Sequence, residues 1–166
     1  CFVGAAETAA MVFMIFLGAD MMNSSLALTQ MPAALAAWMT TLTISPILIM
    51  AVILLFFVVL GCVMDELSML LLTIPVLFPA VMGMDLWGLG AEDKAIWFGI
   101  LVLMVVGVGL VAPPVGLNVY VVNSLAKDVP MSETYKGVMP FLASDVLRVM
   151  ALLFFPVLSL GLVTLL

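Results

Sequence analysis

Residues that could hold ions in an apolar surrounding occur in 107-GVGLVAPPVGLN-118, inside a long apolar run of this 166-residue chain. Pro113 and Pro114 lack a backbone N–H, and each ring clashes with the carbonyl four residues earlier, so a helix must break here. The break frees backbone carbonyls, which are hard oxygen ligands for a cation. The helix that restarts near Val115 offers N–H groups and a positive dipole end to an anion, and Asn118 adds an amide.

A second stretch, 61-GCVMDELS-68, places Asp65 and Glu66 between two apolar runs. One interpretation is two full membrane spans joined by an acidic surface turn. The other is a re-entrant hairpin whose tip ends near the middle of the membrane, where a buried carboxylate needs a partner such as a bound cation. Hydropathy does not separate the two interpretations, and the residues alone leave both open.

Other candidate chemistry is sparse. Asp145 and Arg148 are spaced i, i+3 and can pair on one helix face, for which we favour a structural or interface role over substrate contact. Cys1 and Cys62 are interpreted as small buried hydrophobic residues. The chain has no His, so it has no nucleophile–base pair of the usual kind, and we predict that it is not an enzyme.

The composition indicates an integral membrane protein. Hydrophobic residues make up 67% of the chain and charged residues 8%, whereas a soluble domain has roughly a quarter charged residues. Apolar runs of the length that spans a membrane as a helix recur along the chain, and no run alternates like a barrel strand, so we predict an all-α membrane fold. A net charge of −6 with four basic residues makes nucleic acid an implausible partner.

The segment 95–126 is too long for one straight span. At ~1.5 Å per residue it would reach ~48 Å, against a hydrocarbon core of ~30 Å. We therefore expect two half-helices that meet near residues 110–117, an arrangement that secondary transporters use for ion and substrate sites. A simple proline kink with a packing role is the alternative. The lysines of the loop 127–136 place that loop in the cytoplasm and the loop 85–94 outside.

The other elements follow from apolar runs and breakers. An ordinary span remains an alternative for the second element, which is less hydrophobic than its neighbours and has Trp38 as an interface anchor. The segment Met69–Met84 is expected to be broken by Pro75 and Pro79. We predict a transmembrane helix over 1–22, an interfacial arm helix over 23–45, a helical hairpin over 46–84, the broken transmembrane helix over 95–126, and a C-terminal transmembrane helix over 137–166.

Four motifs together resemble a known family. They are 29-TQMPAALAAWM-39, 61-GCVMDELSMLLLTIPVLFPAVMGMD-85, 107-GVGLVAPPVGLN-118 and 137-GVMPFL-142. In this order they resemble the large membrane subunit of TRAP transporters, the DctM-like permeases, over almost the whole chain. The resemblance places the chain at the C-terminal part of such a permease. The chain begins with Cys inside a helix-like run, so we expect a piece of a longer protein.

The resemblance implies an ion-transporter-like elevator fold, in which this chain supplies one inverted repeat with an arm helix, a re-entrant hairpin, a broken transmembrane helix and a final transmembrane helix. It implies Na⁺-coupled import of small organic anions such as carboxylates, with Na⁺ as coupling ion and no other cofactor. The implied partners are a small TRAP membrane subunit and a periplasmic substrate-binding protein, at the inner membrane of a bacterial or archaeal cell. The alternatives are a related symporter that needs no binding protein and a non-transporting structural subunit.

The resemblance also implies site residues. The tip and break motifs of the family carry the cation and the substrate. The family often has Thr where this chain has Ala112, so a hydroxyl ligand is missing at that position. We predict that the cation is bound by Gly61, Asp65, Gly109, Val111, Ala112 and Pro114, and the substrate by Ser68, Pro113, Gly116 and Asn118.

Overall fold

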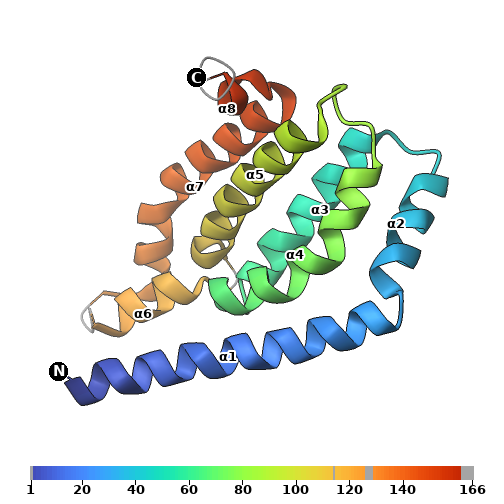
Figure 1. The fold of residues 1–166 in the computed structure, drawn as a ribbon. Helices are drawn as coiled ribbons and strands as arrows, with labels where there is room; N and C mark the ends of the chain where they lie inside the picture. The colour runs from blue at the N-terminus through green and yellow to red at the C-terminus, as the bar shows by residue number, and fades with distance from the viewer. Residues whose placement is uncertain (1, 114, 126–128, 162–166) are drawn as a thin grey trace. The chain divides into compact units, whose positions relative to one another are not determined.

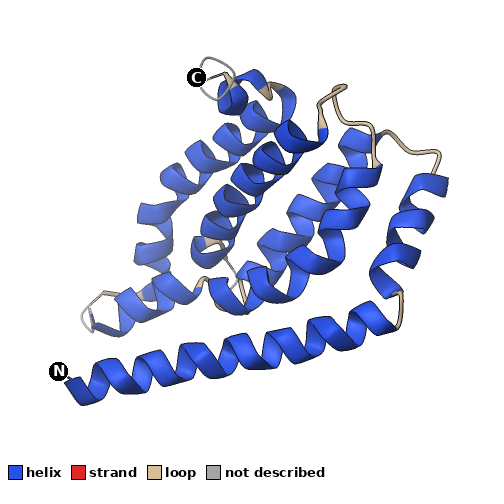
Figure 2. Ribbon diagram, in the orientation of Figure 1, coloured by secondary structure: helices blue, strands red, loops and turns tan. Residues whose placement is uncertain are grey.

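A computed structural model describes residues 2–113, 115–125 and 129–161, the side chain of Thr40 excepted, and within these ranges the chain is helical with no strand (Figures 1 and 2). The predicted all-α class is confirmed. Among the described helices, α1, α4, α5 and α7 are long and apolar enough to cross a membrane. The helices are α1 (Phe2–Leu28), α2 (Met31–Thr41), α3 (Pro46–Gly61), α4 (Glu66–Gly83), α5 (Ala91–Val111), α6 (Leu117–Leu125), α7 (Met131–Phe154) and α8 (Val157–Leu160).

The chain divides into two compact units. The first consists of residues 1–43 and 67–84, which carry α1, α2 and nearly all of α4. The second consists of residues 44–66 and 85–166, which carry α3 and α5 to α8. Each unit joins segments that are distant in the sequence, so contacts within a unit are informative about function.

In the second unit, α5 packs between α3 and α7 (Figure 1). Large apolar side chains on α3 and α5 are fully buried there, among them Phe57, Trp97 and Leu101. Pro46 begins α3, where its missing N–H has no helical partner to lose. Glu92 and Asp93 lie in the first turn of α5, where negative charge interacts favourably with the helix dipole.

In the first unit, α4 corrects one prediction. The expected break at Pro75 and Pro79 is wrong, because α4 is one helix with both prolines inside it. A proline removes a single hydrogen bond from a helix, and a side chain elsewhere can supply the missing donor. Here the side-chain amide of Asn23 on α1 donates to the carbonyl of Leu71, four residues before Pro75, at 2.9 Å.

Several helix ends differ from the predicted ranges. The first helix continues through Leu28, into the range predicted for the arm, and a separate helix, α2, occupies the rest of that range from Met31 to Thr41. The predicted loops at 85–94 and 127–136 are partly helical, because α5 begins at Ala91 and α7 at Met131. Polar side chains at a helix end do not stop the helix; they let it extend toward water. The last segment is not one helix, because α7 ends at Phe154 just before Pro156.

Candidate functional site

The predicted interruption of the fifth segment is confirmed. Helix α5 ends at Val111 and α6 begins at Leu117. Between them Ala112 is extended, with φ −70° and ψ 139°, and Gly116 has a left-handed φ of 51°. A Cβ at Gly116 would lie 3.0 Å from the Val111 carbonyl oxygen and 3.2 Å from that of Ala112. Glycine therefore lets the chain turn back closely onto the carbonyl end of α5.

The end of α3 touches the end of α5 through two glycines. A Cβ at Gly109 would lie 2.9 Å from the Cα of Gly61 and 2.9 Å from the carbonyl oxygen of Val58. A Cβ at Gly61 would lie 3.1 Å from the Cα of Gly109. Small residues allow helix backbones in membranes to approach this closely. Two glycines predicted from separate motifs, one before the acidic turn and one before the break, are thus in direct contact.

The thiol of Cys62 points at the break. Its Sγ lies 3.6 Å from the carbonyl oxygen of Ala112 and 4.0 Å from that of Pro113, and the residue is buried. A thiol is a weak donor, so it can cap a carbonyl that the break leaves without a helix partner. The sequence interpretation of Cys62 as a small hydrophobic residue missed this donor. Its place directly after Gly61 was the available signal.

A second side chain holds the far side of the break. The hydroxyl of Tyr135, on the first turns of α7, donates to the carbonyl oxygen of Val115 at 2.7 Å. Beside it, the hydroxyl of Thr134 donates to Oδ1 of Asn123 on α6 at 2.8 Å. Neither contact was predicted, because residues 127–136 were expected to form a loop and the structure begins α7 at Met131. These contacts hold α6 against α7 within the second unit.

The remaining predicted site residues are more dispersed. Asp65 is exposed in the turn between α3 and α4, Pro113 is exposed in the break, and Asn118 is exposed on the first turn of α6. Ser68 lies on α4 in the first unit, where it lines a hollow of about 320 Å³ with residues of α1 such as Gly18. Pro114 lies outside the described residues. The structure therefore gathers the glycines and carbonyls of the break with Gly61 in the second unit, whereas Ser68 belongs to the first unit.

The donors at this site are mainly backbone groups. Across the described residues, no three Cys, Asp or Glu side chains gather closely enough to hold a metal ion. The carbonyls of Val111 and Ala112 converge toward Gly116, and the adjacent start of α6 offers unpaired backbone N–H groups. Arg148 is paired with Asp145 at 2.9 Å, as predicted from their spacing. The arrangement suits an ion held by backbone dipoles rather than by a cluster of charges.

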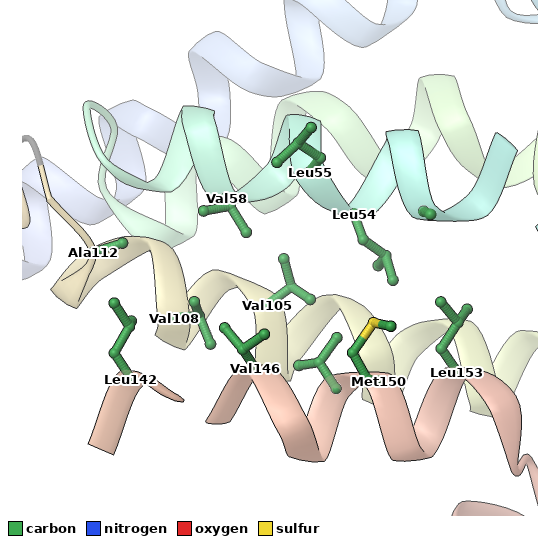
Figure 3. Close-up of a pocket in the computed structure, with 12 residues that line it drawn as sticks. Leu54, Leu55, Val58, Val105, Val108, Ala112, Leu142, Val146, Met150 and Leu153 are labelled. Atoms are coloured by element: carbon green, nitrogen blue, oxygen red, sulfur yellow. The ribbon is translucent and has the colours of Figure 1, made fainter. Parts of the chain in front are cut away.

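An apolar cavity of about 300 Å³ adjoins the break within the second unit. Figure 3 shows Ala112 at one end of it and Leu153 at the other. Its walls come from α3, α5 and α7 and are apolar throughout, so it offers nothing to an ion. The lining residues are Ala51, Leu54, Leu55, Val58, Val105, Val108, Ala112, Leu142, Val146, Val149, Met150 and Leu153.

Known proteins resemble the chain over most of its length. A putative TRAP transporter large permease protein of Haemophilus influenzae is 35% identical over 93% of the chain and 37% of the relative. The C4-dicarboxylate TRAP transporter large permease protein DctM of Pseudomonas aeruginosa is 27% identical, over 91% and 34%. The sialic acid permease SiaM of Vibrio cholerae is 28% identical, over 82% and 30%. No solved structure matches the chain significantly.

The chain thus spans about a third of the length of these relatives. The four helices of the described residues that could span a membrane, together with this likeness, make it a multi-pass membrane protein of a transporter family, not an enzyme. Residues 1–158 match the family described as the DctM component of tripartite ATP-independent periplasmic transporters. Because that match covers nearly all of the chain, the protein belongs to the DctM family of TRAP transporter large permeases.

Proposed function

We propose that this chain is part of a Na⁺-coupled permease that imports small organic anions, delivered by a periplasmic binding protein, across the inner membrane of a bacterial or archaeal cell. A small TRAP membrane subunit completes the complex. The observation that carries the proposal is the contact of Gly61 with Gly109, which joins the end of α3 to the end of α5 where the helix breaks. Broken helices of this kind hold Na⁺ with carbonyls and anions with helix N-termini.

In the proposed site, Na⁺ is coordinated by backbone oxygens at the end of α5. The carbonyls of Val111 and Ala112 are the best placed, because both approach Gly116 closely. Asp65 follows Cys62 in the turn after α3 and supplies the negative charge, since a carboxylate near a membrane-buried cation lowers the cost of both charges. The thiol of Cys62 lies 3.6 Å from the same Ala112 carbonyl oxygen, so it can hold the loop beside the proposed cation site.

The substrate is proposed to bind at the start of α6. The N–H groups of its first turn and the amide of Asn118 belong to a helix start that follows the break, and α6 has no acidic residue in its first turn to repel an anion. Relatives are named for C4-dicarboxylates, sialic acid, isethionate and 2,3-diketo-L-gulonate. These compounds share a small size and a negative charge, which supports a carboxylate or a similar anion as the substrate of this chain.

The length of α3 supports the proposal that α3 and α4 form a re-entrant hairpin. The 16 residues of α3 would extend ~24 Å at ~1.5 Å each, less than the ~30 Å of the hydrocarbon core. A helix of that length fits a hairpin arm that stops inside the membrane. The short α2 is the proposed interfacial arm, with exposed Trp38 at the interface. In this proposal the chain is one inverted repeat of a permease that moves its site by an elevator mechanism.

Uptake into proteoliposomes tests the function. The complete permease and its small subunit are reconstituted, with the binding protein and a labelled C4-dicarboxylate, sialic acid or keto acid outside. We expect uptake under an inward Na⁺ gradient, none under a K⁺ gradient of equal size, and none without the binding protein. Na⁺-driven uptake that persists without the binding protein would instead indicate a symporter that works alone. Absence of flux across the whole anion panel would contradict the transport proposal.

Asp65→Asn tests the site within the same assay. The change removes the charge and keeps the side-chain size, so we expect the Na⁺ concentration for half-maximal uptake to rise about tenfold, equivalent to ~1.4 kcal/mol. Glu66→Gln, at the neighbouring carboxylate, is the matched control and should leave that concentration within about twofold, well under ~1.4 kcal/mol. An unchanged Na⁺ dependence in Asp65→Asn would remove Asp65 from the cation site.

A further inference from the structure

Two prolines outside the proposed ion site each leave a carbonyl without its helix donor. A helix pairs each N–H with the carbonyl four residues earlier, and proline has no N–H to give. Pro75, inside α4, therefore leaves the Leu71 carbonyl without its helix hydrogen bond. Pro156 follows the end of α7, where the N–H of Phe155 still bonds the carbonyl of Ala151 at 2.8 Å. The next carbonyl, that of Leu152, receives no such bond, because Pro156 has no N–H to donate.

In both cases a side chain from another helix reaches the deprived carbonyl. Within the first unit, Nδ2 of Asn23 on α1 donates to the Leu71 oxygen at 2.9 Å. Within the second unit, Nε1 of Trp97 on α5 donates to the Leu152 oxygen at 2.9 Å. The two contacts involve different helices and different side-chain types. They share one feature, which is that each acceptor is the carbonyl four residues before a proline.

The contact of Asn23 has a defined direction. Its Oδ1 is buried without a hydrogen-bond partner, so the side chain contributes through its amide N–H groups. Rotating the amide by half a turn would place Oδ1 against the Leu71 oxygen, which is repulsive, so the donor assignment follows from the contact itself. Trp97 is fully buried, and its indole can only donate.

We infer that Asn23 and Trp97 are positioning residues that replace the helix hydrogen bonds removed by Pro75 and Pro156. In a membrane no water is present to satisfy a freed carbonyl, so a donor from a neighbouring helix is the available substitute. The two proline sites are then fixed bends, each tied to another helix. Asn23 fixes the direction of the first turns of α4, which follow the acidic turn in the chain. Trp97 holds the corner between α7 and α8 against α5.

A double-mutant cycle in the complete permease tests the Trp97 pair. Trp97→Phe keeps an aromatic ring and removes the N–H, and Pro156→Ala restores an N–H that can bond the Leu152 carbonyl. We expect Trp97→Phe to lower Tm by several degrees in the natural background and to have little effect in the Pro156→Ala background. Pro140→Ala is the matched control, because it restores an N–H for the carbonyl of Lys136 and not for that of Leu152. The Tm loss caused by Trp97→Phe should therefore persist in the Pro140→Ala background.

The Asn23 pair gives an independent cycle. Asn23→Leu removes the donor at similar size, and Pro75→Ala restores the helix N–H, so the Tm loss from Asn23→Leu should likewise vanish in the Pro75→Ala background. If either side chain acts only by packing, its substitution should lower Tm by the same amount with and without the proline substitution. Restoring a backbone N–H on the other helix does not fill the space that the smaller or altered side chain leaves. Additive losses would overturn the inference for that pair. Neither cycle depends on transport or on the proposed Na⁺ site.

Discussion

Helix α4 and the α5–α6 break each contain two prolines in an apolar segment, yet only the second is interrupted. In α4, Pro75 and Pro79 are four residues apart, and the helix runs from Glu66 to Gly83 through both. In the second unit, α5 ends at Val111, two residues before Pro113, and five residues separate it from α6, which begins at Leu117. The number of prolines therefore does not decide whether a membrane helix breaks.

Proline spacing explains part of the difference. An isolated proline costs a helix one hydrogen bond, and its neighbours remain free to stay helical. When two prolines are adjacent, the second also drives the first out of the helical region, so at least two residues leave the helix together. Gly116 then reverses the chain with a positive φ, which few other residues adopt without strain.

The surroundings explain the rest. In α4 the deprived Leu71 carbonyl receives the Asn23 amide, which restores the missing bond and keeps the helix intact. At the break, the donors are the Cys62 thiol and the Tyr135 hydroxyl, which hold the chain in its interrupted path. In α4 the side-chain donor replaces a missing helix hydrogen bond, whereas at the break the two donors bind carbonyls of a chain that has already left the helix. Three substitutions sharpen this comparison.

Gly109→Ala should have the largest effect. The new Cβ would lie 2.9 Å from both the Gly61 Cα and the Val58 carbonyl oxygen, so α3 and α5 must move apart. Overpacking of this kind costs about 1–3 kcal/mol, and the displaced break should lower Na⁺-driven uptake by an order of magnitude or more. Both Tm and uptake of the complete permease measure it.

Gly107→Ala is the control for that substitution, two residues earlier on α5. A Cβ there meets nothing within 4 Å, and replacing a helical glycine by alanine is favourable by roughly 0.5–1 kcal/mol. We expect unchanged or raised Tm and normal uptake. If the two alanine variants behaved alike, the close approach of α3 and α5 at the break would be refuted.

Gly116→Ala should have the next largest effect. The left-handed conformation costs an alanine about 1–2 kcal/mol, and the Cβ also lies 3.0 Å and 3.2 Å from the Val111 and Ala112 oxygens. Gly88→Ala is the control, since Gly88 has a φ of 64° but open space around it. Thermal unfolding should show a larger loss for Gly116→Ala, and equal losses would mean that the carbonyls do not crowd Gly116.

The sequence predicted the break better than its surroundings, for a physical reason. Adjacent prolines act through local sterics, which the chain order states directly, so the interruption near residues 110–117 could be placed before the structure was known. Gly61 and Gly109 were each predicted as site residues from separate motifs, but the contact between them was not predicted. Its geometry depends on how α3 packs on α5, which no local pattern encodes.

The residues that the sequence analysis missed share one property. Cys62 and Tyr135 act on carbonyls distant in the chain, and Asn23 overrides the local effect of Pro75 in the same way. A side chain's donors are visible in the sequence, but their acceptors are set by tertiary packing. The predicted break of α4 failed for this reason. Asp65 and Ser68 were singled out from the stretch between two apolar runs that could form a hairpin tip, and their roles stay predictions.

Tyr135→Phe should have the smallest effect of the three substitutions, and it tests whether side-chain donors hold the interrupted path. Losing the hydrogen bond to the Val115 carbonyl should cost about 0.5–1.5 kcal/mol, because the ring remains to pack. Tyr120→Phe is the control, since Tyr120 is 60% exposed on α6 and should be nearly neutral. Thermal unfolding of the complete permease compares the two.

The transport assay adds what stability alone does not give. If Tyr135 keeps α6 aimed at the break, Tyr135→Phe should also raise the substrate concentration for half-maximal uptake, because the N–H groups proposed to hold the anion lie on the first turn of α6. Tyr120→Phe should leave that concentration unchanged. A loss of stability with no change in substrate dependence would make the Tyr135 bond structural only, and would separate the break's architecture from its proposed use as an anion site.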